Sequence, residues 1–299
     1  MNATRLNEPE TEYLVSIRQT LSLAQRRALA ALVARPIYEL VPLKGALDAA
    51  VALPPRSPIT ITSSPRLGLD ATLSLAESLS ARGHDAAPHL AARLIRDRSH
   101  LADVLARLRT AGVRKLFIVG GDGPPVGVIQ DGLMLLREMQ SMGEIFDELG
   151  VPAYPEGHVS IPRDALLSDL RAKQPLVHAM TTQMSFNAEA VAAWVTTIRS
   201  EGIALPIHLG IPGVVGLLKL TSIATRIGVA DSARYLMKQR GMFGHLATRG
   251  SFGPERFLID LAEVLVDPHA DIRALHVFTM NEVAATIAWQ RQMLQELGD

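Results

Sequence analysis

The sequence predicts a (β/α)8 barrel, an α/β fold in which eight parallel strands close on themselves inside a ring of helices. Short apolar runs alternate with longer amphipathic stretches along most of the 299 residues, and this alternation is typical of parallel sheets. There are eight such runs, the number that closes a barrel. The competing fold, an open doubly wound sheet, normally has a glycine fingerprint after its first strand, and IYELVPLKG contains none.

The order of the expected elements follows from the spacing of apolar residues. A helix is expected over residues 10–34, ended by Pro36, and the strands at residues 37–41, 59–62, 86–90, 115–119, 151–154, 177–183, 206–210 and 274–279. Helices are expected at residues 69–81, 99–110, 131–142, 163–173, 187–200 and 214–226, with extra helices at 232–239 and 254–264 before the last strand and a final helix at 280–296. Glycines are expected to end helices at Gly83, Gly112, Gly150, Gly202 and Gly228. We expect one barrel domain over residues 1–299, with residues 1–35 as a helical extension.

The composition excludes several classes of protein. Lys plus Arg and Asp plus Glu number 30 each, and without a basic stripe or a cationic amphipathic face we expect no nucleic-acid or membrane partner. The most apolar stretch, around residues 211–220, is shorter than the roughly 20 residues of a spanning helix. There is no cysteine, which removes disulfides and thiolate chemistry and fits a reducing compartment. The first residues lack the apolar segment of a signal peptide, so we expect a cytoplasmic protein.

Polar residues stand at the ends of the expected strands, where barrel enzymes carry their chemistry. They are Glu39, Thr62 with Ser63, His89, Asp122, Tyr154 with Glu156 and His158, Gln183, His208, and Thr279 with Asn281. Each also has an ordinary structural interpretation. The Glu39 charge would be costly inside an apolar strand unless it is paired in a salt bridge or functional. Asp122 lies in a Gly-Asp-Gly-Pro segment, which is typical of a turn. Gln183 and the histidines could be hydrogen-bonded core or rim groups.

Other motifs of catalysis are missing. GGDGPPVG lacks the spacing and the lysine of a phosphate-binding loop, and its prolines remove N–H donors. No metal site is expected, because His-x-His, His-Glu-x-x-His and EF-hand spacings do not occur. The residues alone therefore indicate a barrel enzyme with an acid in its first strand.

Several segments resemble the methylenetetrahydrofolate reductase family. They are IYELVPLKG, the stretch at residues 96–122 that ends in Gly-Asp, LGVPAYPEGH, TTQMSF and LHVFTMN. The matches keep their order and spacing from about residue 36 to residue 290. The resemblance implies reduction of 5,10-methylenetetrahydrofolate to 5-methyltetrahydrofolate, with NADH or NADPH as the hydride donor and a tetrahydrofolate substrate.

The resemblance also assigns roles to individual positions. Glu39 matches the catalytic acid and Asp122 the aspartate beside the pterin. The resemblance implies substrate contacts for Gln183, Phe186 and Asn281. It also places Thr62, His89, Tyr154 and His158 at positions that line the flavin site in the flavin-dependent members. Glu39, buried in the barrel wall, is expected to hold a proton near neutral pH because burial disfavours the charged carboxylate.

Departures from the family pattern bear on the flavin. The glycine-rich loop after the second strand is SSPRLGLD, the arginine before Gly-Asp is Gly120, and the usual Lys…Asp-Ala-Gly-Ala run is replaced by AKQPLVHA. The last motif has Glu282 where an arginine is frequent. We therefore expect that FAD is absent and that hydride passes directly from the nicotinamide. The alternatives are an FAD-dependent reductase of the same family, a non-catalytic folate-binding barrel, and a metal-dependent hydrolase that uses His89, His158 and His208.

Overall fold

Eight parallel strands close into a barrel in which the first strand pairs with the last. The computed structural model describes residues 19–227 and 251–298. Around the barrel the strand order is β1-β10-β7-β6-β5-β4-β3-β2, which confirms the predicted fold. The strands are β1 Ile37–Leu40, β2 Pro58–Ile61, β3 Asp85–Ala91, β4 Lys115–Val119, β5 Glu148–Ala153, β6 Ala179–Thr182, β7 Ile207–Pro212 and β10 Ile272–Phe278.

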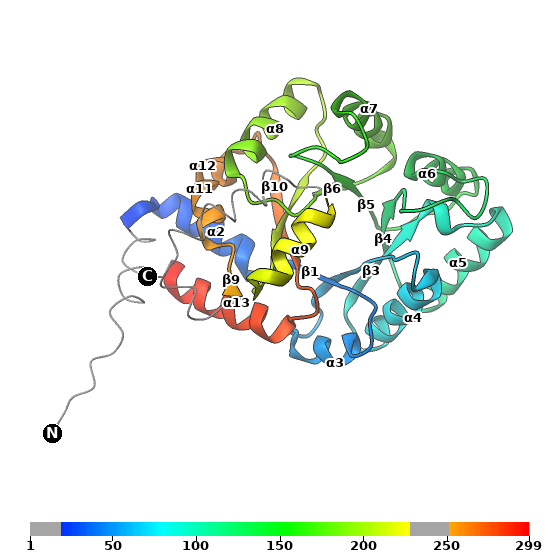
Figure 1. The fold of residues 1–299 in the computed structure, drawn as a ribbon, viewed down its shortest axis with the longest axis horizontal. Coiled ribbons are helices and arrows are strands. Elements are labelled where there is room, and N and C mark those ends of the chain that lie inside the picture. Colours follow the sequence, from blue (N-terminus) through cyan, green and yellow to red (C-terminus); the bar gives the residue numbers. More distant parts are fainter. Residues whose placement is uncertain (1–18, 228–250, 299) are drawn as a thin grey trace.

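Helices lie outside the barrel (Figure 1), and most of them connect successive strands, whereas α2 precedes β1 and α13 follows β10. The principal ones are α2 Leu23–Ala34, α4 Gly68–Ala81, α5 Arg98–Thr110, α6 Gly132–Ser141, α7 Arg163–Lys173, α8 Ala188–Ser200, α9 Leu217–Ile227 and α13 Val283–Leu297, with short α3 Ala46–Ala49, α11 Glu255–Asp260 and α12 Ala262–Val266. The side chains of Asp97, Asp131 and Asn187 cap α5, α6 and α8 by accepting a backbone N–H from the first turn. These bounds confirm most of the expected helices.

Three expectations about elements need correction. Residues 10–18 of the helix predicted over residues 10–34 lie outside the described part of the chain. The described part is interrupted at Leu21 and Ser22, because Ser22 forms a capping box with Gln25 and starts α2 there. Gly150 lies inside β5, and the left-handed glycine after α6 is Gly143, with φ of 70°. Residues 214–226 begin with a short strand, β8 Val215–Gly216, which pairs antiparallel with β9 Ser251–Phe252 before α9 starts. The expected helix at 232–239 and Gly228 lie outside the described residues.

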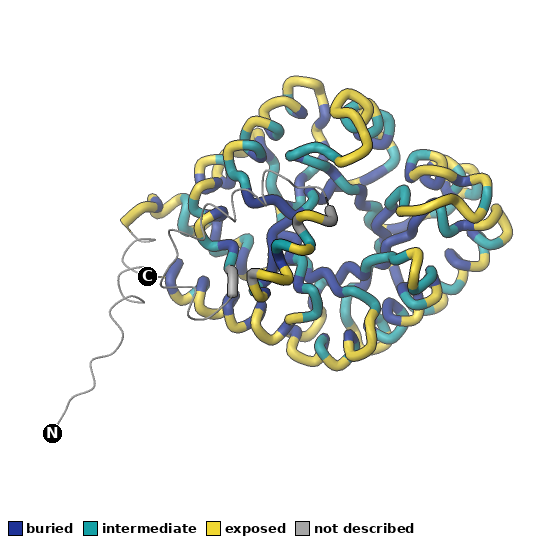
Figure 2. Tube along the Cα trace, viewed as in Figure 1, coloured by how far each residue is buried: buried dark blue, intermediate teal, exposed yellow. Residues whose placement is uncertain are grey.

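Strand residues alternate between the barrel interior and the surrounding helices. Figure 2 shows the buried residues along the strands and on the inner sides of the helices. Tyr38 points outward, where its hydroxyl donates to Gln290 Oε1 of α13 at 2.6 Å. Gln290 in turn donates to the carbonyl of Val33 in α2 at 2.7 Å. These bonds fasten α2 and α13 to β1, and Glu39, the next residue of β1, points to the interior.

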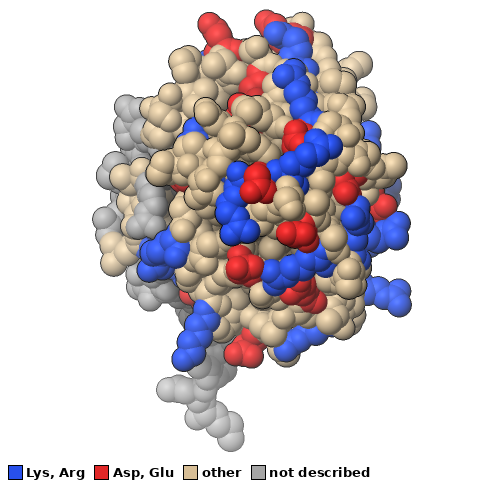
Figure 3. Space-filling model, turned by 90° about the vertical axis from the view of Figure 1, so that its right-hand side faces the viewer, with Lys and Arg blue, Asp and Glu red and all other residues tan. Residues whose placement is uncertain are grey.

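The outer face over α4, α5 and α6 carries Lys and Arg side chains interspersed with Asp and Glu (Figure 3). Arg107 bonds both Glu77 and Asp70, and Arg98 bonds Glu138. Neither sign of charge dominates this face. Within residues 19–227 and 251–298, no helix is long and apolar enough to cross a membrane.

Candidate active site

A buried carboxylate between two imidazoles forms the centre of the site. Glu39 of β1 is only 7% exposed, and its Oε2 lies 3.2 Å from Nε2 of His276 in β10. His89 of β3 approaches the same oxygen from the other side, with its Nε2 at 3.6 Å. The Phe117 ring packs against the His89 ring, with a centroid distance of 4.5 Å and a tilt of 34°. Burial among these rings leaves the Glu39 carboxyl group little contact with solvent, so its polar contacts are with these side chains.

His89 is a neutral partner of Glu39 at neutral pH. Burial lowers the pKa of His89 to about 4, and the nearby Glu39 carboxylate only partly opposes this effect. The contact of His89 with Glu39 is therefore not an ion pair at pH 7. His276 is 1% exposed, and its Nε2 also lies 3.3 Å from the hydroxyl of Thr60 in β2. Thr60, His276 and Glu39 thus form one buried polar group across three adjacent strands.

The barrel seam, where β1 pairs with β10, is stabilised next to Glu39 by side chains that follow β10. Thr279 donates its hydroxyl to the carbonyl of Glu39 at 2.6 Å. Asn281 accepts from the backbone N of Val41 and donates to the carbonyl of Val41, each at 2.9 Å. Asn281 has a φ of 63°, a left-handed conformation that asparagine tolerates better than most residues. Both ends of its amide are engaged by backbone, so in this conformation Asn281 fixes the end of β1.

A second group of predicted residues gathers at the carboxyl end of β5. Tyr154 and His158 pack edge to face at 5.1 Å. Burial, followed by the negative charges of Asp122 and Asp169, raises the pKa of Tyr154 to about 12. Asp122 itself is exposed in the loop after β4, and Thr62 is half-buried at the end of β2. The carboxyl-terminal end of the barrel, here called the mouth, therefore presents hydroxyl, imidazole and carboxylate groups above the buried Glu39.

Gln183 and Phe186 follow β6 on another side of the mouth. Gln183 accepts the backbone N–H of Met184 at 3.0 Å, so its oxygen is turned back on its own loop. Phe186 is 1% exposed and packs in an apolar cluster with Met184, Val215 and Leu220. Leu220 belongs to α9, so α9 covers this side of the mouth. Phe186 is thus buried under α9 in this conformation, and the structure does not bring it to Glu39.

The cations on α7 already have carboxylate partners. Arg171 lies 2.6 Å from Glu201, and Lys173, which is 5% exposed, bonds Asp169.

In the loop after β4, the turn residues of GGDGPPVG pack against the chain after β3. A Cβ on Gly127 would stand 1.9 Å from the carbonyl oxygen of Arg96, so this glycine is required by close backbone packing.

Two histidines show the limits of the sequence analysis. His276 was not predicted, because it lies inside its strand and not at the strand end, although an imidazole between Leu275 and Val277 in an apolar strand is itself a signal of an interior polar group. His208 was expected at the carboxyl end of its strand, and this is wrong. β7 extends to Pro212, so His208 is its second residue and lines a cavity at the opposite end of the barrel. Among the described residues no cluster of His, Asp and Glu could hold a metal ion.

A closed (β/α)8 barrel with an acid at its centre and polar groups around the carboxyl-terminal mouth is the architecture of a barrel enzyme. The chain belongs to the methylenetetrahydrofolate reductase family, whose model matches residues 58–293. It is 27% identical over 208 residues to a Caenorhabditis elegans protein named as a probable methylenetetrahydrofolate reductase (NADPH), covering 66% of this chain and 30% of that protein. The aligned part therefore spans less than a third of this relative.

A solved structure supports the same fold. A protein from Clostridium thermocellum, described as binding two copies of 5-methyl-5,6,7,8-tetrahydrofolic acid, superposes with a TM-score of 0.59 at 12% identity. The match covers 92% of this chain and 98% of that one.

Proposed function

We propose that the protein reduces 5,10-methylenetetrahydrofolate to 5-methyltetrahydrofolate with a nicotinamide dinucleotide as the hydride donor. The observation that carries this proposal is the buried Glu39 carboxyl at the centre of a barrel of the methylenetetrahydrofolate reductase family. The Caenorhabditis elegans relative named for NADPH and the Clostridium thermocellum fold neighbour with bound methyltetrahydrofolate support a folate substrate and a nicotinamide donor.

The reaction needs a proton before it needs a hydride. The five-membered ring of the substrate must open to an N5 iminium, and opening requires a proton on the departing amine nitrogen. Glu39 is the proposed donor, because it is the acid buried at the centre of the barrel, where His276 at 3.2 Å and His89 at 3.6 Å hold its carboxyl group in place.

Residues at the mouth would hold and stabilise the substrate. Asp122 would stabilise the iminium cation through its negative charge. Gln183 would hold the pterin edge, for which its amide must turn away from Met184. The nicotinamide supplies the hydride to the iminium carbon when both molecules are bound.

We further propose that no flavin takes part. A flavin dinucleotide brings a pyrophosphate that needs several N–H donors or cations. The α7 cations Arg171 and Lys173 are engaged by Glu201 and Asp169, so they do not fit a pyrophosphate without first giving up these partners. Tyr154, His158 and Thr62 would then border the space for the nicotinamide.

Spectroscopy and kinetics test both parts of the proposal. The purified protein should show no flavin absorbance between about 350 and 500 nm, yet it should oxidise NADH or NADPH when methylenetetrahydrofolate is supplied. Direct transfer requires a ternary complex, so reciprocal plots at several folate concentrations should intersect. Stoichiometric flavin with parallel plots would leave the reductase standing and overturn the flavin-free route. Folate binding without turnover would instead identify a non-catalytic folate-binding barrel.

A further inference from the structure

The amino-terminal end of the barrel, opposite the proposed substrate mouth, holds a cavity lined by both apolar and polar side chains. Its volume is about 40 Å³, which is enough space to hold water. In barrels of this class the interior is usually filled with layers of branched apolar side chains. A cavity whose lining includes charged residues and two imidazoles is therefore a departure from that packing.

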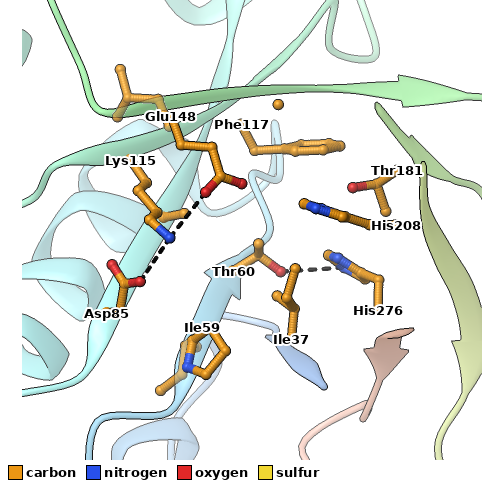
Figure 4. A pocket seen from close by; sticks show the side chains of 14 residues that line it. Ile37, Ile59, Thr60, Asp85, Lys115, Phe117, Glu148, Thr181, His208 and His276 are labelled. Carbon is orange, nitrogen blue, oxygen red and sulfur yellow. Dashed lines mark hydrogen bonds and ion pairs between the residues drawn. The ribbon is translucent and has the colours of Figure 1, made fainter. Parts of the chain in front are cut away.

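The cavity reaches solvent through three charged residues that begin adjacent strands. Lys115 of β4 lies 2.9 Å from both Asp85 of β3 and Glu148 of β5 (Figure 4). The side chains of Lys115 and Glu148 are each 32% exposed and that of Asp85 is 41% exposed. These partly solvated groups line the cavity, so bulk water can exchange with its contents at this amino-terminal opening.

The inner end of the cavity is polar and leads to His276. Thr60, Thr181 and His208 line it together with His276 (Figure 4). Burial lowers the pKa of His208 to about 4, so this ring is neutral and adds no charge at pH 7. The His276 ring is 1% exposed, and its Nδ1 is buried without a hydrogen-bond partner in the described structure. A small shift of the ring toward the cavity would let a water molecule there give this nitrogen the partner that a buried polar atom ordinarily has.

His276 thus joins the cavity to the proposed acid. Its Nδ1 lacks a protein partner, and its Nε2 lies 3.2 Å from Glu39 Oε2. We propose that the protons consumed at Glu39 enter from the amino-terminal end of the barrel, through this cavity and His276, while substrates occupy the opposite end. This inference rests on the proposed function, in which Glu39 gives up one proton in each turnover.

The proton balance closes without another reactant. Cavity water gives a proton to His276 Nδ1 as the Nε2 proton passes to the Glu39 carboxylate. The hydroxide left behind takes a proton from bulk solvent through the amino-terminal opening of the cavity. The ring stays neutral but is now protonated on Nδ1. It regains its first tautomer when Nδ1 returns a proton to cavity water and the Thr60 hydroxyl, 3.3 Å from Nε2, hands one on. Thr60 recovers its own proton from cavity water, since it also lines the cavity.

Two substitutions of His276 separate a relay from a mere support for Glu39. His276→Gln keeps an N–H donor for Glu39 but cannot pass a proton through the side chain. We expect kcat to fall by roughly 10- to 100-fold with KM unchanged, and the solvent deuterium isotope effect on kcat to rise. His276→Ala should be equally slow and should be rescued by added imidazole. Wild-type turnover of His276→Gln, or His276→Ala that imidazole does not rescue, would overturn the relay.

A second pair of variants tests the cavity without touching Glu39 or His276. Ala87 of β3 lines the cavity, and Ala87→Leu would fill it, whereas Ala87→Ser would leave it open. We expect the isotope effect to rise and kcat to fall in Ala87→Leu only, with both proteins folded by circular dichroism. Equal turnover of the two variants would overturn the route while the wild-type reductase activity stands. An inactive wild-type protein would overturn the proposed function, and this route with it.

Discussion

The Glu39 carboxylate lies 3.2 Å from the His276 imidazole, although the two residues are 237 positions apart in the sequence. Barrel closure creates this proximity, because β1 and β10 pair in a register that sets Ile37 opposite His276 and Glu39 opposite Phe278. The proposed acid therefore stands at the seam where the first and last strands meet. Its chemistry and the integrity of the fold depend on the same few residues.

Glu39→Gln is expected to abolish most of the turnover. The amide keeps the size and polarity of the side chain but has no carboxyl proton to donate, so kcat should fall by about 10²–10⁴-fold. Folate affinity, measured by fluorescence titration, should change little, because the proton is needed only when the substrate ring opens. A variant with near wild-type kcat would remove Glu39 from the mechanism.

Asp122→Asn is expected to slow the chemical step more than it weakens binding. Asp122 is exposed in the loop after β4, and the cation it would stabilise appears only as the iminium forms. Single-turnover oxidation of the nicotinamide should therefore slow while the folate Kd changes by less than about threefold. A change confined to the folate Kd would assign Asp122 to ground-state binding instead.

Asn281→Gly is expected to destabilise the barrel seam. Glycine accepts the φ of 63° but loses both bonds to the Val41 backbone, which should cost about 1–2 kcal/mol of unfolding free energy. Asn281→Ala should lose more, since alanine also pays about 1 kcal/mol for the left-handed conformation. Urea unfolding measures both values. Equal stability of the wild type and the glycine variant would show that the two bonds contribute nothing net.

Stability is expected to fall as the solution becomes acidic. Burial lowers the pKa values of His89 and His208 from 6.5 to about 4. Between these values the unfolded chain binds protons that the native state does not. The unfolding free energy should therefore decrease as pH falls from about 6.5 toward 4, by up to about 1.4 kcal/mol per pH unit for each group. Urea midpoints from pH 7 to pH 5 should decline less in the double variant His89→Gln/His208→Gln. Parallel declines in the two proteins would contradict this origin.

The sequence allowed the barrel and its first-strand acid to be predicted, because both depend on local patterns. Each strand is a short apolar run, and Glu39 stands out as a charge inside one of them. Strand lengths were less accessible, since a run such as PIHLG does not show that β7 continues through Ile211 and Pro212. This error of two residues placed His208 at the wrong end of the barrel.

Partners across the barrel could not be read from the sequence at all. The contact between His276 and Glu39 depends on strand register, which only closure fixes. Phe186 and Asn281 show the converse problem, because a motif match does not reveal what else a side chain touches. Phe186 packs under α9, and the Asn281 amide is taken up by Val41. Their expected contacts with substrate stay predictions that folate KM values of their variants can test.

The bonds between Val41 and Asn281 join residues that are 240 positions apart. A ribosome adds about 5–20 residues per second, so the second partner emerges roughly 10–50 s after the first. During that interval β1 has no β10 to pair with, and an unpaired strand edge is a template for wrong pairing with other chains. The barrel seam is thus the last part of the sheet that can form during synthesis. Substitutions at Asn281 or Thr279 should therefore lower the yield of correctly folded protein in the cell more than equilibrium stability alone would indicate.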